Sequence, residues 1–475
     1  TIAGNKEQIE EWKKLFSIDK ISGDSDHMAY QEPINIQFLK ENPYLIVDTK
    51  FFDFWFKAKV LSEIYDIEEK TNGLLVSSEN FQALSLLQNR YKNSIKCTYI
   101  DPPYNTSEGT FLYKNLYKDS SWLSMIYNRL ELSKQFFFNE SVIGIAIDDY
   151  ELHNLLGLCD GVYGNNKRLG NLVIEIKPSG RTNDNYLATS HDYLVMYAQN
   201  PKDASISFFE LSEEQKKAYS SGEGDNAHKW RDFMRTGGYS TPEERPNSYY
   251  PIYYNPNTKH ISIDKINGYI EILPVDSEGR HRVWRKTKPS LQKHLDKNEI
   301  QVSLKRGSTT EYKVQIIDKI KDGVRPKSVW TGSKYDASTH GTKLLKKIFG
   351  ESYNFSFPKS LYATQDCIYL AVGDDEEAVI LDYFAGSGTT GHAVINLNRE
   401  DDGNRKYILV EMGEYFNNVT KPRVLKAAYS TSWDSGVPVK RDGVSHIIKY
   451  IRLEQYEDTL DNLKDSNQDS RLILD

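Results

Sequence analysis

The stretch Thr98-Tyr-Ile-Asp-Pro-Pro-Tyr-Asn-Thr106 joins an apolar, strand-like run to two adjacent prolines. Proline lacks the N–H that a strand or helix interior needs, so the run ends in a stiff loop at Asp101. This loop offers the Asp101 carboxylate, the Pro102 carbonyl and the ring of Tyr104. Two acceptors beside an aromatic face suit an amino group on a planar ring, because that amine has two hydrogens to donate. A plain Pro-Pro turn at a strand end is the alternative.

The segments around this loop alternate between the patterns of strands and helices. Strand patterns cover residues 74–76, 97–100, 141–147, 172–176, 193–198, 378–385 and 407–410, and helical apolar spacing covers residues 80–91, 122–138, 341–349 and 392–398. A strand, a helix and a strand in that order indicate a parallel sheet. The sequence therefore predicts an α/β fold with an open, mostly parallel, Rossmann-like sheet, whose strand ends hold the ligands.

A second motif, Gly386-Ser-Gly-Thr-Thr-Gly391, lies between a strand pattern and a helix pattern. It lacks both the glycine spacing of dinucleotide sites and the lysine of a phosphate loop. Glu411 closes the next strand, where an acidic side chain accepts hydrogen bonds from ribose hydroxyls. A nucleoside with a charged group other than phosphate fits best, and S-adenosylmethionine is the common one. A purely structural strand–turn–helix is the alternative.

The composition is that of a globular protein of 475 residues with a formal net charge of −7. It has no apolar run of membrane-spanning length, and its three cysteines lie far apart, so we expect no membrane, no disulfide framework, no metal site and a cytoplasmic location. Residues 225–345 carry 22 Lys and Arg against 14 Asp and Glu, interleaved with Tyr and Trp. This segment is either a nucleic-acid surface or a solvated face over an aromatic core.

Composition and periodicity divide the chain into five parts. They are an N-terminal helical arm (1–70), a first half of the α/β domain that contains the Asp-Pro-Pro-Tyr loop (71–200), an inserted basic domain (201–340), a second half that contains the glycine turn (341–430) and a C-terminal extension (431–475).

The order of the two motifs resembles that of the β class of DNA amino-methyltransferases, in which Asp-Pro-Pro-Tyr precedes Phe-x-Gly-x-Gly. The resemblance extends over about residues 72–465. It includes Ser190-His-Asp-Tyr193, Phe357-Pro-Lys-Ser360 and the ending Lys449-Tyr-Ile-Arg-Leu-Glu-Gln-Tyr-Glu-Asp-Thr-Leu460, which is similar to the modification subunit of type III restriction-modification systems. The chain departs from the family pattern at Ser78-Glu79, Asp192 and Ser360.

This resemblance implies a circularly permuted methyltransferase fold with an inserted target-recognition domain. The implied reaction transfers a methyl group from S-adenosylmethionine to the N6 of adenine in duplex DNA after base flipping. The implied partners are double-stranded DNA, a second copy of the chain in a homodimer, and a helicase-endonuclease restriction subunit.

The resemblance and the motifs together predict the site residues. Catalysis is assigned to Asp101, Pro102, Pro103 and Tyr104; cofactor binding to Glu79, Asp101, Phe357, Pro358, Lys359, Asp382, Phe384, Gly386, Ser387, Gly388, Thr389, Thr390 and Glu411; and contact with the base or the DNA to Tyr104, His191, Tyr193, Arg231, Arg235, Arg282 and Arg285.

Three other functions use the same parts. An N4-cytosine methyltransferase differs in the base it accepts, an RNA methyltransferase in its substrate, and a non-catalytic DNA-specificity subunit in lacking the reaction. The intact Asp101, Tyr104, Gly386 and Glu411 argue against the last of these. The DNA sequence that is read is not indicated.

Overall fold

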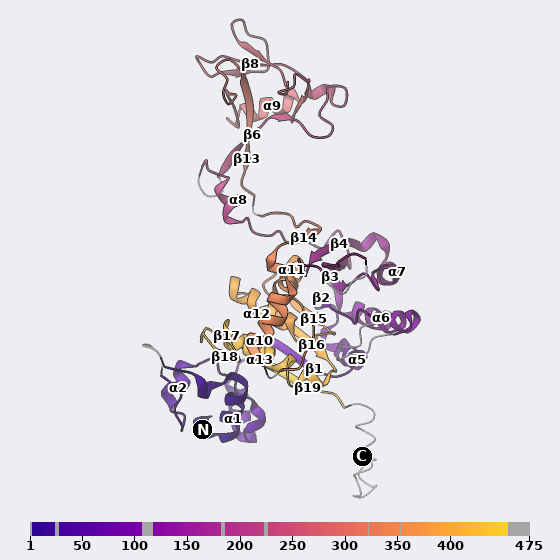
Figure 1. Ribbon diagram of the computed structural model, residues 1–475, viewed down its shortest axis with the longest axis vertical. Helices are drawn as coiled ribbons and strands as arrows, with labels where there is room; N and C mark the ends of the chain where they lie inside the picture. The colour runs from indigo at the N-terminus through magenta and orange to yellow at the C-terminus, as the bar shows by residue number, and fades with distance from the viewer. Residues whose placement is uncertain are drawn as a thin grey trace, which may run out of the picture. The chain divides into compact units, whose positions relative to one another are not determined.

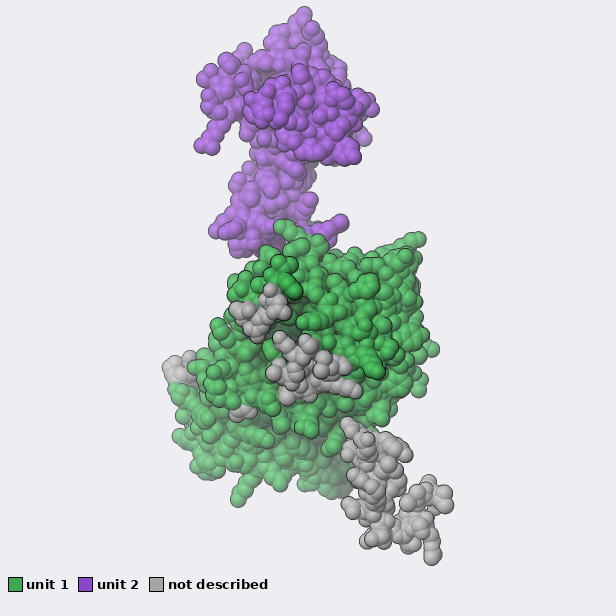
Figure 2. All heavy atoms as spheres, turned by 45° about the vertical axis from the view of Figure 1, so that its right-hand side comes forward, with its two compact units in different colours: residues 1–207, 326–475 green, residues 208–325 purple. Residues whose placement is uncertain are grey.

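The structure, a computed structural model, describes residues 2–23, 28–106, 117–181, 186–222, 227–321, 323–351 and 353–454. The chain forms two compact units (Figures 1 and 2), one made of Thr1–Ser207 with Pro326–Asp475 and the other of Phe208–Arg325. The smaller unit lies within the segment 201–340 that the sequence predicts as an insertion. The predicted extension 431–475 is described only to residue 454, so residues 455–460 of the stretch that resembles type III subunits lie outside the described residues.

The larger unit is built on one sheet, which has nine strands among the described residues in the order β14-β4-β5-β3-β2-β15-β16-β1-β19. The strands are β1 (Gly73–Ser77), β2 (Ile95–Ile100), β3 (Phe137–Ile147), β4 (Arg168–Glu175), β5 (His191–Ala198), β14 (Val329–Trp330), β15 (Val379–Asp382), β16 (Lys406–Glu411) and β19 (Ile448–Arg452). Only β5 runs antiparallel to its neighbours within this described sheet. The predicted open, mostly parallel α/β sheet is therefore confirmed.

The late strands β15 and β16 lie between the early strands β2 and β1. Ile380 and Leu381 of β15 pair with Cys97 and Thr98 of β2 in parallel. Since parallel strands end at the same edge, the loop after β2 and the glycine turn after β15 leave the sheet side by side.

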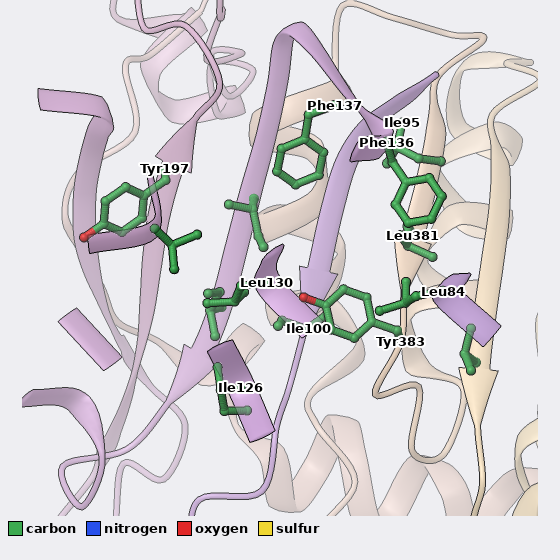
Figure 3. Packing of buried hydrophobic residues seen from close by; sticks show 14 of the residues in the cluster. Leu84, Ile95, Ile100, Ile126, Leu130, Phe136, Phe137, Tyr197, Leu381 and Tyr383 are labelled. Carbon is green, nitrogen blue, oxygen red and sulfur yellow. The ribbon is translucent and has the colours of Figure 1, made fainter. Parts of the chain in front are cut away.

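Helices cover both faces of this sheet, which is why its central strands are buried and apolar throughout. One face carries α5 (Asn80–Tyr91), α6 (Asp119–Ser133) and α7 (Leu152–Tyr163), and the other carries α11 (Leu361–Val372), α12 (Thr389–Asp401) and α13 (Thr420–Tyr429) (Figure 1). Leu84 of α5 and Ile126 and Leu130 of α6 belong to the same buried cluster as Ile100 and Leu381 (Figure 3).

Several element boundaries differ from the sequence prediction, and two of them have a clear physical reason. Residues 122–138 are predicted as one helix, but α6 ends at Ser133, and a 3-10 turn (Lys134–Phe136) leads into β3 at Phe137. Phe137 is buried and pairs with Ile95 of β2, so sheet pairing overrides the helical spacing of this stretch. The strand predicted over 378–385 ends as β15 at Asp382, because the Asp382 side chain accepts a hydrogen bond from the Phe384 N–H and turns the chain.

The helical N-terminal arm packs on the same unit. Its helices are α1 (Lys6–Phe16), α2 (Ile36–Glu41), α3 (Phe54–Glu63) and α4 (Ile67–Lys70). Trp12 and Phe16 of α1 lie in one buried cluster with Tyr429 of α13 and Trp433, while α10 (Leu344–Phe349) adds Ile348. The short strands β17 (Trp433–Asp434) and β18 (Val437–Pro438) form a hairpin beside this cluster.

The smaller unit has its own core, formed by Phe233, Trp284, Leu291 and Ile316 among others. Its elements are α8 (Glu213–Lys217), β6 (His228–Asp232), β7 (Met234–Arg235), β8 (Ile252–Tyr254), β9 (Ile261–Ser262), β10 (Ile270–Ile272), β11 (Val283–Trp284), α9 (Lys288–Leu295), β12 (Ile300–Leu304) and β13 (Tyr312–Lys319). They form small antiparallel sheets, one of them ordered β12-β13-β6. Among all helices of the described residues, none has the length and hydropathy that crossing a bilayer requires.

The contact between β1 and β16 predicts a sharp difference between two glycine substitutions. A Cβ on Gly73 would lie 2.4 Å from ring atoms of Tyr407, whose side chain is buried and whose hydroxyl bonds the His446 Nε2 atom at 2.6 Å. We expect Gly73→Ala to lower the free energy of unfolding by about 1–3 kcal/mol, because the ring has little room to move.

The matched substitution is Gly157→Ala at an exposed position of α7, where a Cβ meets nothing within 4 Å. This change should raise the free energy of unfolding by about 0.4–1 kcal/mol, since alanine loses less backbone entropy. Urea denaturation of the two variants measures both effects. Equal denaturation midpoints for them contradict the close β1–β16 packing.

Candidate active site

One cavity of about 740 Å³ lies at the sheet edge where β2, β15, β16 and β1 end. Its size falls in the range of small-molecule sites. The lining combines residues from the loop after β2 with residues from the turn after β15, although these segments are far apart in the sequence. The predicted site residues that line it are Glu79, Asp101, Pro103, Phe357, Lys359, Asp382, Phe384, Gly386, Ser387, Thr389, Thr390 and Glu411.

The remaining predicted residues lie elsewhere. Pro102, Tyr104, Pro358 and Gly388 are neighbours of lining residues in the chain. His191 and Tyr193 lie on β5 outside the cavity lining, where the Tyr193 hydroxyl donates to Asp149 and contacts the His191 Nε2 atom, both at 2.9 Å. Arg231, Arg235, Arg282 and Arg285 belong to the smaller unit.

The glycine turn is braced by the Glu411 carboxylate. Glu411 Oε2 accepts a hydrogen bond from Gly386 N at 2.8 Å, and Oε1 accepts from Met412 N and Gly413 N at 2.9 and 2.8 Å. Burial raises the pKa of Glu411, while these backbone donors favour its ionised form. Sequence reasoning assigns this residue to ribose, and the structure adds that its carboxylate also holds the turn.

The turn also needs glycine at position 388. Gly388 has φ +78°, and a Cβ there would lie 3.0 Å from the Thr420 carbonyl oxygen. Thr420 in turn donates its hydroxyl to the Gly386 carbonyl at 2.6 Å. The chain therefore passes through a left-handed conformation directly before α12, at a point where a side chain has no room.

Asp382 and Arg423 support the turn from within the core. Asp382 Oδ2 accepts a hydrogen bond from the Thr390 hydroxyl at 2.6 Å, and burial raises the pKa of Asp382 to about 7. Arg423, which is fully buried, donates from Nη1 to the Ser387 and Thr389 hydroxyls, both at 2.7 Å. No sequence motif pointed to Arg423, which lies within an otherwise ordinary helical segment.

The Asp-Pro-Pro-Tyr loop is anchored by the helices that follow it. Trp122 of α6 is fully buried and donates its indole N–H to the Pro103 carbonyl at 2.8 Å. Asn105 donates from Nδ2 to Glu151 at 2.7 Å and to the Tyr117 carbonyl at 3.0 Å. The loop is therefore held from both sides, as a stiff loop at a strand end should be.

Lys359 connects this loop to β5. Its ammonium lies 3.3 Å from Asp101 Oδ1 and 2.7 Å from Asp192 Oδ2, and it donates a hydrogen bond to the Tyr104 hydroxyl. The Tyr104 hydroxyl itself donates to Asp192 Oδ2 at 2.9 Å. Asp192 is buried and was not among the predicted site residues; its place in the stretch 190–193 was the available signal.

Glu79 is similarly paired. It lies at the start of α5, where it accepts a hydrogen bond from the Gln82 N–H, and its other oxygen lies 2.5 Å from Arg129 Nη2. Arg129 also donates to Asn80, whose amide donates to the Tyr383 carbonyl. Arg129 and Asn80 line the cavity, but their positions in amphipathic helices gave no sequence signal.

The charge of the lining limits what the cavity can bind. It contains five carboxyl groups, from Glu79, Asp101, Asp382, Glu411 and Glu414, against two cationic side chains, from Arg129 and Lys359. Both cations are already paired with carboxylates. An acidic cavity of this kind disfavours polyphosphates and suits a positively charged ligand, while its aromatic side chains, such as Phe355 and Phe384, offer faces for a planar ring.

The parallel sheet and the paired strand-end motifs place the chain among Rossmann-like α/β proteins. The model of the N6/N4 DNA methylase family matches residues 95–422. The chain belongs to this family.

The chain is similar to curated proteins of two kinds. It is 27% identical over 419 residues to the Mod subunit of the type III restriction-modification enzyme EcoPI from Escherichia phage P1, covering 80% of this chain and 63% of that protein. It is 29% identical to the type II methyltransferase M.KpnI from Klebsiella pneumoniae, covering 72% of this chain and 81% of that protein. The Escherichia coli EcoP15I Mod subunit is 25% identical, with 77% and 62% covered. The chain thus spans less than two thirds of either type III relative.

Among solved structures, the chain is similar to the putative DNA modification methylase TTHA0409 from Thermus thermophilus, crystallised with S-adenosyl-L-methionine. The sequence identity is 11%, the TM-score is 0.37, and the match covers 81% of this chain and 100% of that one.

The anchoring of the loop by Trp122 predicts a local effect of Trp122→Phe. The change removes the donor to the Pro103 carbonyl, so we expect a loss of about 1–3 kcal/mol in the free energy of unfolding and faster hydrogen exchange at the Tyr104 and Asn105 amides. The matched control is Trp12→Phe, since Trp12 is equally buried and donates to the Ile46 carbonyl at 2.7 Å. The control should lose similar stability without changing exchange in the loop. The same exchange rates in both variants contradict the anchoring role.

Proposed function

We propose that the protein transfers a methyl group from S-adenosylmethionine to the N6 of adenine in duplex DNA, as the modification subunit of a type III restriction-modification system. The observation that carries this proposal is the acidic cavity in which Asp101 and Pro103 meet the Gly386 turn and Glu411. Membership of the DNA methylase family and the similarity to type III Mod subunits support it.

The residues of the cavity fit this cofactor. Its sulfonium group supplies an electrophilic methyl group, and the acidic lining favours that positive charge over phosphates. The turn at Gly386–Gly388 lets a ligand approach the backbone closely, and Phe384 offers a ring face beside it. Glu411 and Glu79 are the acceptors for ribose and adenine, respectively, each held in place by protein donors.

The loop after β2 acts on the target base. The lone pair of an aromatic amine is delocalised into its ring, which makes the nitrogen a poor nucleophile. When Asp101 and the Pro102 carbonyl accept its two hydrogens, the nitrogen can become pyramidal and expose this lone pair. Orientation and removal of water then supply the acceleration, without a covalent enzyme intermediate. The base leaves the duplex at a cost of a few kcal/mol, and the Tyr104 ring stacks on it.

The smaller unit provides the DNA contacts. Arg231, Arg235 and Arg285 lie near one another, since Arg231 and Arg235 both contribute, after burial, to lowering the pKa of Arg285. Like charges gathered at one place favour an anionic partner. Arg282 differs, because its guanidinium pairs with Asp276 at 2.9 Å and is mostly buried. We therefore assign DNA contact to the first three and a supporting role to Arg282.

The proposal extends to the partners of the chain. We propose a homodimer that works with a helicase-endonuclease restriction subunit in the cytoplasm. The names of the EcoPI and EcoP15I relatives support the association with such a system.

Asp101→Ala is the direct test of the reaction. Loss of one of two acceptors for the amine should lower single-turnover methylation by about a hundredfold or more, by analogy with the loss of one preorganised hydrogen-bond partner in other enzymes. Binding of S-adenosylmethionine, measured by calorimetry, should persist at least in part. Asp203→Ala, at an exposed turn, is the control. Mass spectrometry of the product DNA identifies the base: N4-methylcytosine or an unmodified product overturns the proposed reaction, as does near-normal turnover of Asp101→Ala.

Arg231→Ala and Arg285→Ala test the DNA surface. An arginine that reads a base should cost about 1–3 kcal/mol and relax one position of the site, whereas one that holds a phosphate should weaken all sequences and reduce the salt slope by about one. Arg306→Ala is the control, because Arg306 is an exposed arginine in the hairpin between β12 and β13. Fluorescence anisotropy with duplex DNA over a salt series separates the two roles. Equal effects of all three substitutions contradict the assignment.

A further inference from the structure

Four side chains from three parts of the chain meet beside the Asp-Pro-Pro-Tyr loop. Asp101 and Tyr104 come from the loop after β2, Asp192 from β5, and Lys359 from the segment before α11. Lys359 Nζ has three hydrogens, and it faces three acceptors: Asp101 Oδ1, Asp192 Oδ2 and the Tyr104 hydroxyl. Its donors are thus directed at two groups of the loop and one group of β5.

The Tyr104 hydroxyl is fixed twice. It accepts a hydrogen bond from Lys359 and donates one to Asp192 Oδ2 at 2.9 Å. The Lys359 ammonium also lies 4.1 Å from the centre of the Tyr104 ring. The ring therefore cannot turn about its own loop without breaking contacts to two other elements.

We propose that Asp192 and Lys359 are positioning residues of the methylation site: Asp192 holds the Lys359 ammonium where it keeps Asp101 ionised and the Tyr104 ring in one orientation. This inference rests on the proposed function. It gives Lys359 a role toward the target base in place of the cofactor contact that the sequence suggested, and it makes Asp192 part of the site.

The charges around Asp101 determine whether each substitution raises or lowers the pKa of Asp101. Burial raises the pKa of Asp101, Lys359 opposes that rise, and Asp192 adds to it. Tyr99 of β2 and Asp382 of β15 lie within electrostatic reach of Asp101 as well.

Two further groups face Asp192 and Lys359 rather than Asp101. Asp148, at the end of β3, is buried, and burial together with Asp192 raises its pKa to about 7. Arg181 Nη2 lies 3.6 Å from Asp192 Oδ1. Lys359 and Arg181 oppose the rise in the Asp148 pKa, so Asp148 belongs to the same group of interacting charges.

The expected shifts have opposite directions. Because Asp101 accepts a hydrogen from the amine in its ionised form, activity falls as the pH drops through its pKa. The acidic limb of the pH profile is the pH range in which kcat/KM falls as the pH drops. Lys359→Met removes the cation and should move this limb to higher pH by about one pH unit or more. Asp192→Asn removes a neighbouring negative charge and should move the limb to lower pH. In both variants kcat at the plateau should fall, because the Tyr104 ring loses a contact.

The experiment measures kcat/KM on duplex DNA from pH 5 to 9 for the full chain and five variants, together with S-adenosylmethionine binding by calorimetry. Lys359→Arg and Asp192→Glu retain the charges and should keep the limb near its wild-type position. Lys334→Met is the matched control, since Lys334 pairs with Asp366 at 2.9 Å outside the cavity. It should leave the profile unchanged.

The outcomes separate the two proposals. A wild-type chain that does not methylate DNA overturns the proposed function. A wild-type chain that is active, with variants that lose activity equally at every pH and keep the limb in place, overturns the inference and indicates a merely structural pair. Weakened cofactor binding as the main effect of Lys359→Met also overturns it. If Lys359→Met and Asp192→Asn do not fold, the test rests on Lys359→Arg and Asp192→Glu, which keep the charges. If either of these two variants shifts the acidic limb by about one pH unit, the shift does not come from the charge, and the inference is overturned.

Discussion

The candidate site depends on the parallel pairing of β2 with β15. Cys97 and Thr98 lie beside Ile380 and Leu381, and this pairing carries two separate strand-end segments to one edge of the sheet. Neither segment makes a cavity alone: the first contributes a carboxylate and prolines, and the second a glycine turn. Their strands are apolar on both faces because helices cover both sides, so the sheet core and the cavity derive from the same packing.

Buried polar groups then fix the backbone of the glycine turn at this edge of the sheet. Glu411, Asp382 and Arg423 each use hydrogen bonds to hold the glycine turn, and each has its pKa moved by burial toward the neutral form. In such a place an unpaired polar group is costly, so the hydrogen bonds that these groups do make favour one backbone conformation of the turn. Glu411 and Asp382, which sequence reasoning assigns to a ligand, therefore also hold the backbone of the turn that would contact that ligand.

The two units differ in their local charge. The larger unit holds the cavity, and the smaller unit holds the arginine cluster on an independent core. Residues 225–345 are rich in Lys and Arg within a chain of net charge −7, whereas the cavity is lined by more carboxyl groups than cations. Opposite local charges thus serve the two ligands of the proposed reaction.

The sequence by itself determined the α/β class, the two strand-end motifs and 12 of the 28 residues that line the cavity. These follow from local patterns: proline and glycine restrict the backbone, and buried strands must be apolar. It misplaced the boundary between α6 and β3, since Phe137 belongs to a strand only through its pairing with Ile95. It also passed over Arg129, Asp192 and Arg423, whose roles arise from contacts with Glu79, Lys359 and Ser387. Tertiary structure decided these contacts, because they join segments far apart in the chain; only Asp192, within the stretch 190–193, had a local signal in the sequence.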